Sequence, residues 1–546
     1  MADGRDEAPA TGAPQRYLWT NLFRSFQVAL DPRKLLVAAA GILIMSFGWY
    51  VLSATFYYDK PIRGAAEYDN KTLDREVPAK DGIDREAQLR EEGDRRYLRD
   101  LKRWQVIDEL AGPAVEPSKD DPLGKPAGRM RAMPWDEARG PNPYLFASQL
   151  AGQPATTWAE AALKYVLRQI PVLVEPLTKI LLPIIKMVDA NAGFRTRVYL
   201  LLCLLWSVAV WAFCGGVITR LAAVQFGGKE RTSLMQAVKF VLSRYVSYVL
   251  SPVVPLSVVA VILLCMFLYG VVALIPFVGD ILLYGLLFPL VIVGGIAMAI
   301  ILLGLVGYPL MYTTISTEGS DTFDAISRSY NYVFQAPWSF VWNSLVALAY
   351  GAAVTFVVIL IACLMVLLGK FGMATAASTL WTPSKPDYLF VYAPDSYGWR
   401  EMLLKGSDME LVPGTTAPAN PTLSDAYYKS LTGLNKAGAG LVAFWLAIVF
   451  LFMIGFSYSY FWSAYTMVYL LMRKKVDEVE LDEVYIEEAP PAPPMSPPPA
   501  TTAPSGGASL PVVPPPPLPP APTPPAHPVL PPPAPSSTTL PDEPKV

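Results

Sequence analysis

Long apolar segments alternate with polar ones along most of this chain, and six of the apolar segments are long enough to cross a lipid bilayer. A bilayer core requires roughly 20 apolar residues in a helix, because no water is present there to satisfy an unpaired backbone group. Between their polar flanks, none of the six contains Asp, Glu, Lys, Arg or His. They are approximately 35–57, 197–219, 250–274, 282–312, 338–368 and 440–470. The pattern predicts an all-α membrane protein with about six transmembrane helices.

A second pattern precedes three of these segments. In 18–30, in 233–250 and in the part of 317–338 before its proline, apolar side chains recur at helical spacing with polar ones opposite. The apolar side of the last stretch consists of Phe323, Ile326, Tyr330, Val333 and Phe334. The prolines that follow the three stretches are Pro32, Pro252 and Pro337. We therefore predict three hairpins of two spans, each preceded by a cytoplasmic amphipathic helix.

The distribution of basic residues predicts the orientation. They gather before the first span, between the second and third spans, and after the sixth. The residues are Arg24, Arg33, Lys34, Arg220, Lys229, Arg231, Lys239, Arg244, Arg473, Lys474 and Lys475. Basic loops stay on the cytoplasmic side, so both termini are predicted to be cytoplasmic. The two long connections, 58–196 and 371–437, are then extracytoplasmic.

These patterns divide the chain into consecutive regions. We expect a disordered N-terminus over 1–17, an amphipathic helix and the first span over 18–57, and an extracytoplasmic loop region over 58–196. The following regions are spans two to five (197–370), a second extracytoplasmic loop (371–437), the sixth span (438–475) and a cytoplasmic tail (476–546). Within the first loop, the mixed charges of 84–110 predict a solvated helix.

Residues 173–189 of the first loop have one broad apolar face but are not expected to form a seventh span. Glu175, Lys179 and Lys186, together with two prolines, favour an interfacial helix on the outer side.

The tail is first acidic, over 476–489, and then almost a proline polymer, with PPPPLPP at 514–520. Such a composition cannot bury a core and favours disorder and the polyproline II conformation. It predicts either a docking segment for a cytoplasmic protein or a spacer that has no partner.

Composition excludes several classes of function. With 53% hydrophobic and 16% charged residues the chain is typical of integral membrane proteins, and a net charge of −2 gives no reason to expect a nucleic-acid partner. The four cysteines lie in apolar runs, and His527, the single histidine, lies in the tail. We therefore expect no cofactor, no metal site, no catalytic residues and no enzymatic activity. Asp321 and Asp324 are better explained by the start of a helix than by paired catalytic carboxylates.

Two groups of residues are candidates for other contacts. Lys239, Arg244 and Arg328 are predicted to contact lipid headgroups at the interface. In the sixth span, Ser457, Ser459 and Ser463 indicate either a polar path for a substrate or hydrogen bonds between helices. The fourth span is rich in Gly and Pro, which favours close helix packing over a hinge or a broken transport helix.

Three segments, 215–245, 308–338 and RGPNPYLF at 139–146, resemble recurring features of uncharacterised bacterial multi-pass membrane proteins, over about residues 15–475. The hairpin with an interfacial helix is also similar, more loosely, to the membrane domain attached to some glycerophosphodiester phosphodiesterases. The catalytic part of those enzymes needs His and metal-binding carboxylates, which this chain cannot supply. The resemblance implies a membrane fold and no known activity, and we expect a location in the bacterial inner membrane.

Three hypotheses about function follow. The first is a non-enzymatic scaffold, whose partners are the lipid bilayer and a cytoplasmic protein that docks on the tail. The second is a transporter of small molecules or lipids, and the third is a lipid-modifying enzyme with its site at Asp321, Asp324 and Arg328.

Overall fold

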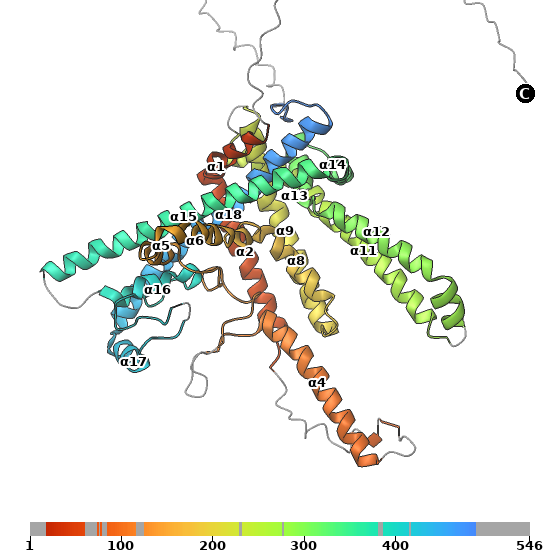
Figure 1. The fold of residues 1–546 in the computed structure, drawn as a ribbon, viewed down its shortest axis with the longest axis horizontal. Coiled ribbons are helices and arrows are strands. Elements are labelled where there is room, and N and C mark those ends of the chain that lie inside the picture. The colour runs from red at the N-terminus through yellow and green to blue at the C-terminus, as the bar shows by residue number, and fades with distance from the viewer. Residues whose placement is uncertain are drawn as a thin grey trace, which may run out of the picture. The chain divides into compact units, whose positions relative to one another are not determined.

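The computed structural model describes residues 18–59, 74–75, 77–78, 84–115, 125–228, 232–275, 278–380, 386–413 and 416–486. Within these ranges the chain forms helices and two isolated β-bridges but no β-strand. Six helices are long and apolar enough to span a membrane. They are α2 (Pro32–Phe56), α9 (Phe194–Phe226), α11 (Tyr245–Val272), α12 (Phe288–Leu305), α15 (Pro337–Leu380) and α18 (Gly433–Val476) (Figure 1). The predicted all-α membrane class with six spans is confirmed, whereas 1–17 and 487–546 lie outside the described residues.

The two spans of each predicted hairpin pack against each other, α2 on α9, α11 on α12 and α15 on α18. Short helices precede each pair: η1 (Leu18–Phe23) with α1 (Arg24–Ala29), then α10 (Leu234–Ser243), then α14 (Thr322–Gln335). Asp31 caps α2 by accepting a hydrogen bond from the backbone N–H of Arg33. Pro32 and Pro337 are the first residues of their spans, where a missing N–H costs nothing.

The second of these joins differs from the prediction. Residues 233–250 do not form one helix that ends before Pro252, because α10 ends at Ser243 and α11 already begins at Tyr245. Pro252 therefore lies inside α11 and cannot donate a hydrogen bond to the carbonyl of Tyr248. The hydroxyl of Ser251 donates to that carbonyl instead, at 3.2 Å. A neighbouring side chain thus allows the helix to continue through the proline.

The fourth span is interrupted. The predicted stretch 282–312 is divided among a π-helix, η3 (Val278–Leu286), then α12 and finally α13 (Tyr308–Glu318). At the break before α13, the hydroxyl of Ser329 donates to the carbonyl of Gly307 at 2.8 Å. α13 ends at Gly319, which has a left-handed φ of 68°. Ser320 and Asp321 are both possible caps by sequence, and it is Asp321 that caps α14 by accepting from the backbone N–H of Asp324.

Both long connections fold into short helices. The first contributes α4 (Arg85–Ala111), α5 (Pro143–Ala151), α6 (Ala155–Leu167), α7 (Ile170–Leu173) and α8 (Glu175–Met187). The second contributes η4 (Pro386–Phe390), η5 (Ser396–Gly398), α16 (Trp399–Leu404) and α17 (Pro421–Ser430). These pieces contact the spans directly: α8 packs on α9, α7 on α15 and η4 on α18. Segments from the two connections therefore meet beside the spans.

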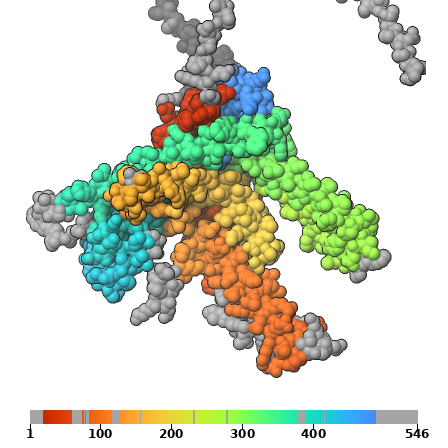
Figure 2. All heavy atoms as spheres, viewed as in Figure 1, coloured from red at the N-terminus to blue at the C-terminus, as the bar shows by residue number. Residues whose placement is uncertain are grey.

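The core of the described part lies among α2, α9, α13 and α18, which contact one another. In the most apolar part of α9, 67% of the residues are buried, against 17% in α11 and 6% in α12. The light-green atoms of α11 and α12 form a surface that no other described segment covers in Figure 2. Apolar side chains on an exposed surface of this kind are suited to face lipid.

Candidate functional site

One side of α18 connects two groups of charged residues. Tyr458, Trp462, Thr466 and Tyr469 recur at i, i+4, i+8 and i+11, and therefore share a face of the helix. The hydroxyl of Tyr458 donates to the Glu175 carboxylate at 3.0 Å, and that of Tyr469 donates to Glu318 at 2.6 Å. Residues eleven positions apart in a helix are separated by about 16 Å along its axis. The two carboxylates thus approach α18 at two different levels.

The first group, which we call the loop network, consists of Glu137, Arg139, Glu175 and Lys179 with Tyr458. The Nε of Arg139 donates to Glu175 at 2.7 Å, and Arg139 also donates to Glu137 and to the carbonyl of Pro134. Lys179 donates to Glu137 at 2.8 Å. Arg139, Glu175 and Lys179 are only 6%, 7% and 8% exposed. Two positive and two negative charges cancel, as burial of ions requires.

The pKa values of this network follow from its pairing. Burial lowers the pKa of Arg139, but the nearby Glu175 and Glu137 outweigh it and raise that pKa above the ordinary value. Burial raises the pKa of Glu137, but Lys179 and Arg139 outweigh it and lower that pKa below the ordinary value. Glu137 and Arg139 are therefore charged at neutral pH.

Sequence reasoning missed this network. From the sequence, the charges of Glu175 and Lys179 argue against a seventh span and predict an outer interfacial helix. In α8 these two residues are buried, whereas Ile185 and the following Val188 are 65% and 75% exposed. A signal was present, because Glu175 and Lys179 are spaced i, i+4 on one helix face. Arg139, the partner of Glu175, lies 36 residues earlier, too far for a local pattern to indicate it.

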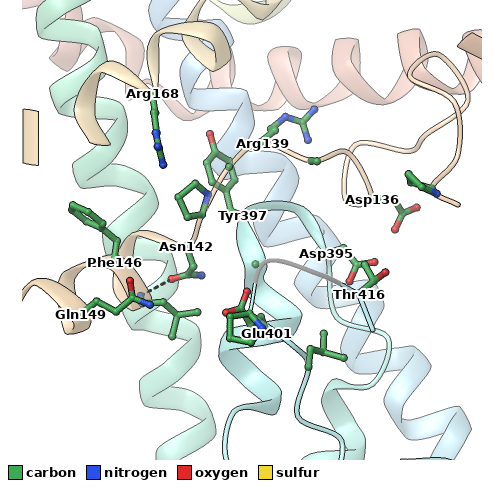
Figure 3. A pocket seen from close by; sticks show the side chains of 18 residues that line it. Asp136, Arg139, Asn142, Phe146, Gln149, Arg168, Asp395, Tyr397, Glu401 and Thr416 are labelled. Atoms are coloured by element: carbon green, nitrogen blue, oxygen red, sulfur yellow. Dashed lines mark hydrogen bonds between the residues drawn. The ribbon is translucent and has the colours of Figure 1, made fainter. Parts of the chain in front are cut away.

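Beside the network lies a cavity of about 790 Å³, which we call the loop pocket (Figure 3). All of its lining residues come from the two long connections. They are Pro126, Asp136, Ala138, Arg139, Gly140, Pro141, Asn142, Leu145, Phe146, Gln149, Arg168, Asp395, Tyr397, Gly398, Glu401, Leu411, Pro413 and Thr416. Four residues of RGPNPYLF, one of the segments singled out in the sequence, form hydrogen bonds that fix this part of the wall. Asn142 caps α5 by accepting from the N–H groups of Tyr144 and Leu145, and Tyr165 donates to the carbonyl of Pro141 at 2.5 Å.

The charged groups at the pocket differ in their pairing. Asp395 forms an ion pair with Arg400 at 3.0 Å. Loss of solvent around its carboxyl, together with the nearby Asp395, raises the pKa of Asp136 to about 6. Tyr397 has a φ of 55°, an uncommon left-handed value for a residue other than glycine. Backbone strain of this kind is concentrated at functional sites.

The second group, the tail-side cluster, surrounds Glu318 at the end of α13. Glu318 accepts from Tyr469, forms an ion pair with Arg328 at 2.9 Å and lies 3.5 Å from Arg473. Arg328 also pairs with Asp324 at 3.1 Å. Arg328, which is predicted to contact lipid headgroups, thus forms ion pairs with two carboxylates.

The start of the tail packs on the same region, in what we call the tail anchor, residues 477–486. The backbone N–H of Tyr485 donates to the carbonyl of Thr317 at 2.8 Å. Its ring lies beside Gly319, where a Cβ atom would stand 2.9 Å from it. Arg244, another predicted lipid contact, lies over the Tyr485 ring at 5.6 Å and donates to the carbonyl of Gly319 at 3.2 Å. Lys239, the third, is exposed on α10.

The three serines of the sixth span have separate surroundings. Ser457 donates to the carbonyl of Ile454 in its own helix at 2.7 Å. Ser459 donates to the carbonyl of Ala29 at 2.8 Å and so joins α18 to the end of α1. Ser463 is buried and has no hydrogen-bond partner within the described part of the chain. Tyrosines, rather than these serines, reach the charged groups.

Comparison of the chain with protein families, with curated proteins and with solved structures finds no match. Functional inference therefore depends on the geometry described above.

Proposed function

We propose that this membrane protein is a non-enzymatic scaffold of the bacterial inner membrane, which presents its proline-rich tail to a cytoplasmic protein. The tail anchor is the observation that carries the proposal. Tyr485 bonds to Thr317 and packs on Gly319, so the tail starts from a defined point on the spans. Arg473 strengthens that point by donating to the carbonyls of Glu480 and Glu483.

Proline-rich segments suit docking because their polyproline II conformation leaves little entropy to lose on binding. The partner expected from this chemistry is a protein domain with an aromatic groove. A tail that starts from a fixed base would hold such a domain close to the membrane surface.

The proposal is tested by cross-linked purification from the native membrane, with the full chain and with a chain that lacks 490–546. A matched variant replaces Pro514, Pro515, Pro516 and Pro517 with alanine, which keeps the length of the tail. We expect a set of proteins that the full chain retains and that both altered chains lose. An identical set from all three chains would overturn the docking proposal.

A second candidate, transport of a small solute, is supported by a different observation. Tyr308, Tyr312, Trp462 and Ser463 are buried, and their side-chain polar atoms have no hydrogen-bond partner within the described residues. Trp462 stacks on Tyr312 at 5.2 Å and lies on the face of α18 between Tyr458 and Tyr469. Buried polar groups of this kind usually bind ordered water. Water at these positions would form a polar path between Glu175 and Glu318.

Transport is tested in proteoliposomes, with proton flux followed by a pH-sensitive dye and with uptake of labelled amino acids. Tyr312→Phe should lower any flux, whereas Tyr392→Phe, at an exposed position, should leave it unchanged. An inert protein in both assays would exclude these solutes.

A further inference from the structure

We propose that the loop pocket binds a small zwitterionic solute, of the class of short peptides, with its anionic end at Arg168 and its ammonium end at Asp136. This inference goes beyond the scaffold proposal and is independent of the tail.

The walls of the pocket are held by buried contacts. Arg139, which lines it, is fixed by the loop network and also donates to the Ser396 hydroxyl at 3.2 Å. The neighbouring Tyr397 is 1% exposed and donates to Gln169 at 3.3 Å. These two hydrogen bonds thus join the first long connection to the second beside the pocket. A cavity with such walls keeps its form when empty, which lowers the cost of binding.

The charged residues of the pocket form two groups: those that interact with a partner within the chain, and those that form no ion pair. Arg139 and Asp395 have ion-pair partners, and Glu401, the remaining charged residue of the lining, also has an interaction partner. Arg168 is exposed, Asp136 has a carboxyl that the pocket wall partly shields from solvent, and neither forms an ion pair within the described part of the chain. An unpaired cation and an unpaired anion in one cavity match a ligand that carries both signs.

The two available charges lie at opposite ends of the pocket. In Figure 3, Arg168 points into it from the end of α6 on one side, and Asp136 lies on the other side near Asp395. A ligand that reaches both must be elongated, with its charged groups at its ends. A short peptide at neutral pH has this form, a carboxylate at one end and an ammonium group at the other.

The volume of the pocket and the apolar part of its lining agree with a short peptide as the ligand. Pockets for small molecules have volumes of about 300–1,000 Å³, and this one is about 790 Å³. The apolar part of the lining consists chiefly of Leu145, Phe146, Leu411, Pro141 and Pro413. Such a wall accommodates the side chains and Cα groups of a peptide.

Titration calorimetry on the full chain in detergent tests the proposal, with trialanine as the probe. N-acetyl-trialanine lacks the ammonium group and trialanine amide lacks the carboxylate, so each removes one proposed contact. We expect saturable binding of trialanine and at least tenfold weaker binding of both capped forms. Equal affinity for all three peptides, or no binding at millimolar concentrations, would overturn the proposal.

Variants assign the two ends. Arg168→Ala should weaken trialanine at least tenfold and abolish its advantage over the amide, whereas Arg168→Lys should restore part of that advantage. Asp136→Asn should abolish the advantage over the acetylated form. Arg197→Ala, at an exposed arginine on α9 outside the pocket, is the matched control and should bind trialanine normally. A normal melting temperature for each variant excludes misfolding as the cause of a loss.

A lipid headgroup could offer the same pair of charges, so phosphoethanolamine forms a separate arm. Weaker binding of phosphoethanolamine than of trialanine supports a soluble ligand. Tighter binding that depends on both Arg168 and Asp136 would overturn the peptide assignment and make the pocket a headgroup site.

Discussion

Arg139 and Arg168 lie in the same connection, and both line the loop pocket, but they differ in their surroundings. Arg139 is buried and fully engaged by Glu175 and Glu137, whereas Arg168 is exposed and has no ion pair within the described residues. A buried ion needs partners of opposite charge, because its interactions with them offset the free energy lost when the ion leaves water. An exposed arginine without a partner costs nothing in stability and can meet a ligand. The same residue type thus serves structure in one position and recognition in the other.

Loss of Arg139 should give the largest effect. Arg139→Ala leaves Glu175 buried beside a single remaining cation, Lys179. Breaking a buried pair by removal of one partner costs about 3–5 kcal/mol, so the free energy of unfolding in detergent should fall by that amount. Arg168→Ala, at an exposed site, should change it by less than about 0.5 kcal/mol. Similar losses for the two variants would invalidate the distinction drawn between them.

The tyrosines of α18 come next. Tyr458→Phe removes the hydrogen bond to Glu175, and Tyr469→Phe removes that to Glu318. A hydrogen bond to a charged group contributes about 1.5–3 kcal/mol, and each variant should lose that much in unfolding experiments. Tyr392→Phe, at a tyrosine that is 40% exposed, is the control and should be neutral. An unchanged stability for Tyr458→Phe would mean that the loop network holds Glu175 without α18.

The sequence identified the spans because the bilayer forces every backbone group to be satisfied within an apolar helix. It also indicated two adjacent residues as possible caps of α14, one of them Asp321, since capping depends on neighbours a few residues away. Glu175 and Lys179 could not be placed, because local periodicity assigns charged residues to a solvated face. Their burial depends on Arg139 and on Tyr458, which is 283 residues away from Glu175. Long-range pairing of charges leaves no local pattern.

Long-range pairing also explains why the partners of two residues predicted to contact lipid could not be identified from the sequence. Arg328 and Arg244 have the sequence positions expected of interfacial basic residues, and their contact with lipid stays a prediction. Their actual partners, Glu318 and the ring of Tyr485, were not predicted, because Glu318 precedes the turn at Gly319 and Tyr485 follows the sixth span. The loop pocket could not be predicted from the sequence, because it forms only where the two long connections meet. Only RGPNPYLF was recognised in advance as a segment of interest.

Gly319 provides a smaller effect, specific to the tail anchor. Gly319→Ala strains a residue whose φ is 68° and places a Cβ atom 2.9 Å from the ring of Tyr485. The left-handed conformation alone costs about 1 kcal/mol. We expect faster proteolysis within 477–486. Gly406→Ala is a matched control, because Gly406 has a φ of 77° but no atom within 4 Å of the added Cβ. It should show the strain without the faster cleavage of the tail anchor.

The smallest expected effect is a pH dependence caused by Asp136. It should have opposite signs for trialanine binding and for the stability of the fold. Its pKa is raised to about 6 from an ordinary value of 3.8. A carboxyl with a raised pKa favours the folded state most below pH 4, and this contribution is lost as the pH rises through about 6. Binding of trialanine needs the charged carboxylate and should change in the opposite direction, weakening as the pH falls below about 6.

The two opposite trends can be separated by calorimetry and thermal unfolding between pH 5 and pH 7, a range in which the amino group of trialanine stays protonated. In Asp136→Asn the trend in binding should disappear, while the affinity at pH 7 is already low. The trend in stability should weaken without vanishing, because burial also raises the pKa of the neighbouring Asp395. A variant that kept the pH dependence of binding would place the ammonium contact on another carboxylate of the pocket. In that case the comparison of paired and unpaired charges would still hold for Arg139 and Arg168, but the cationic end of the ligand would need a different position.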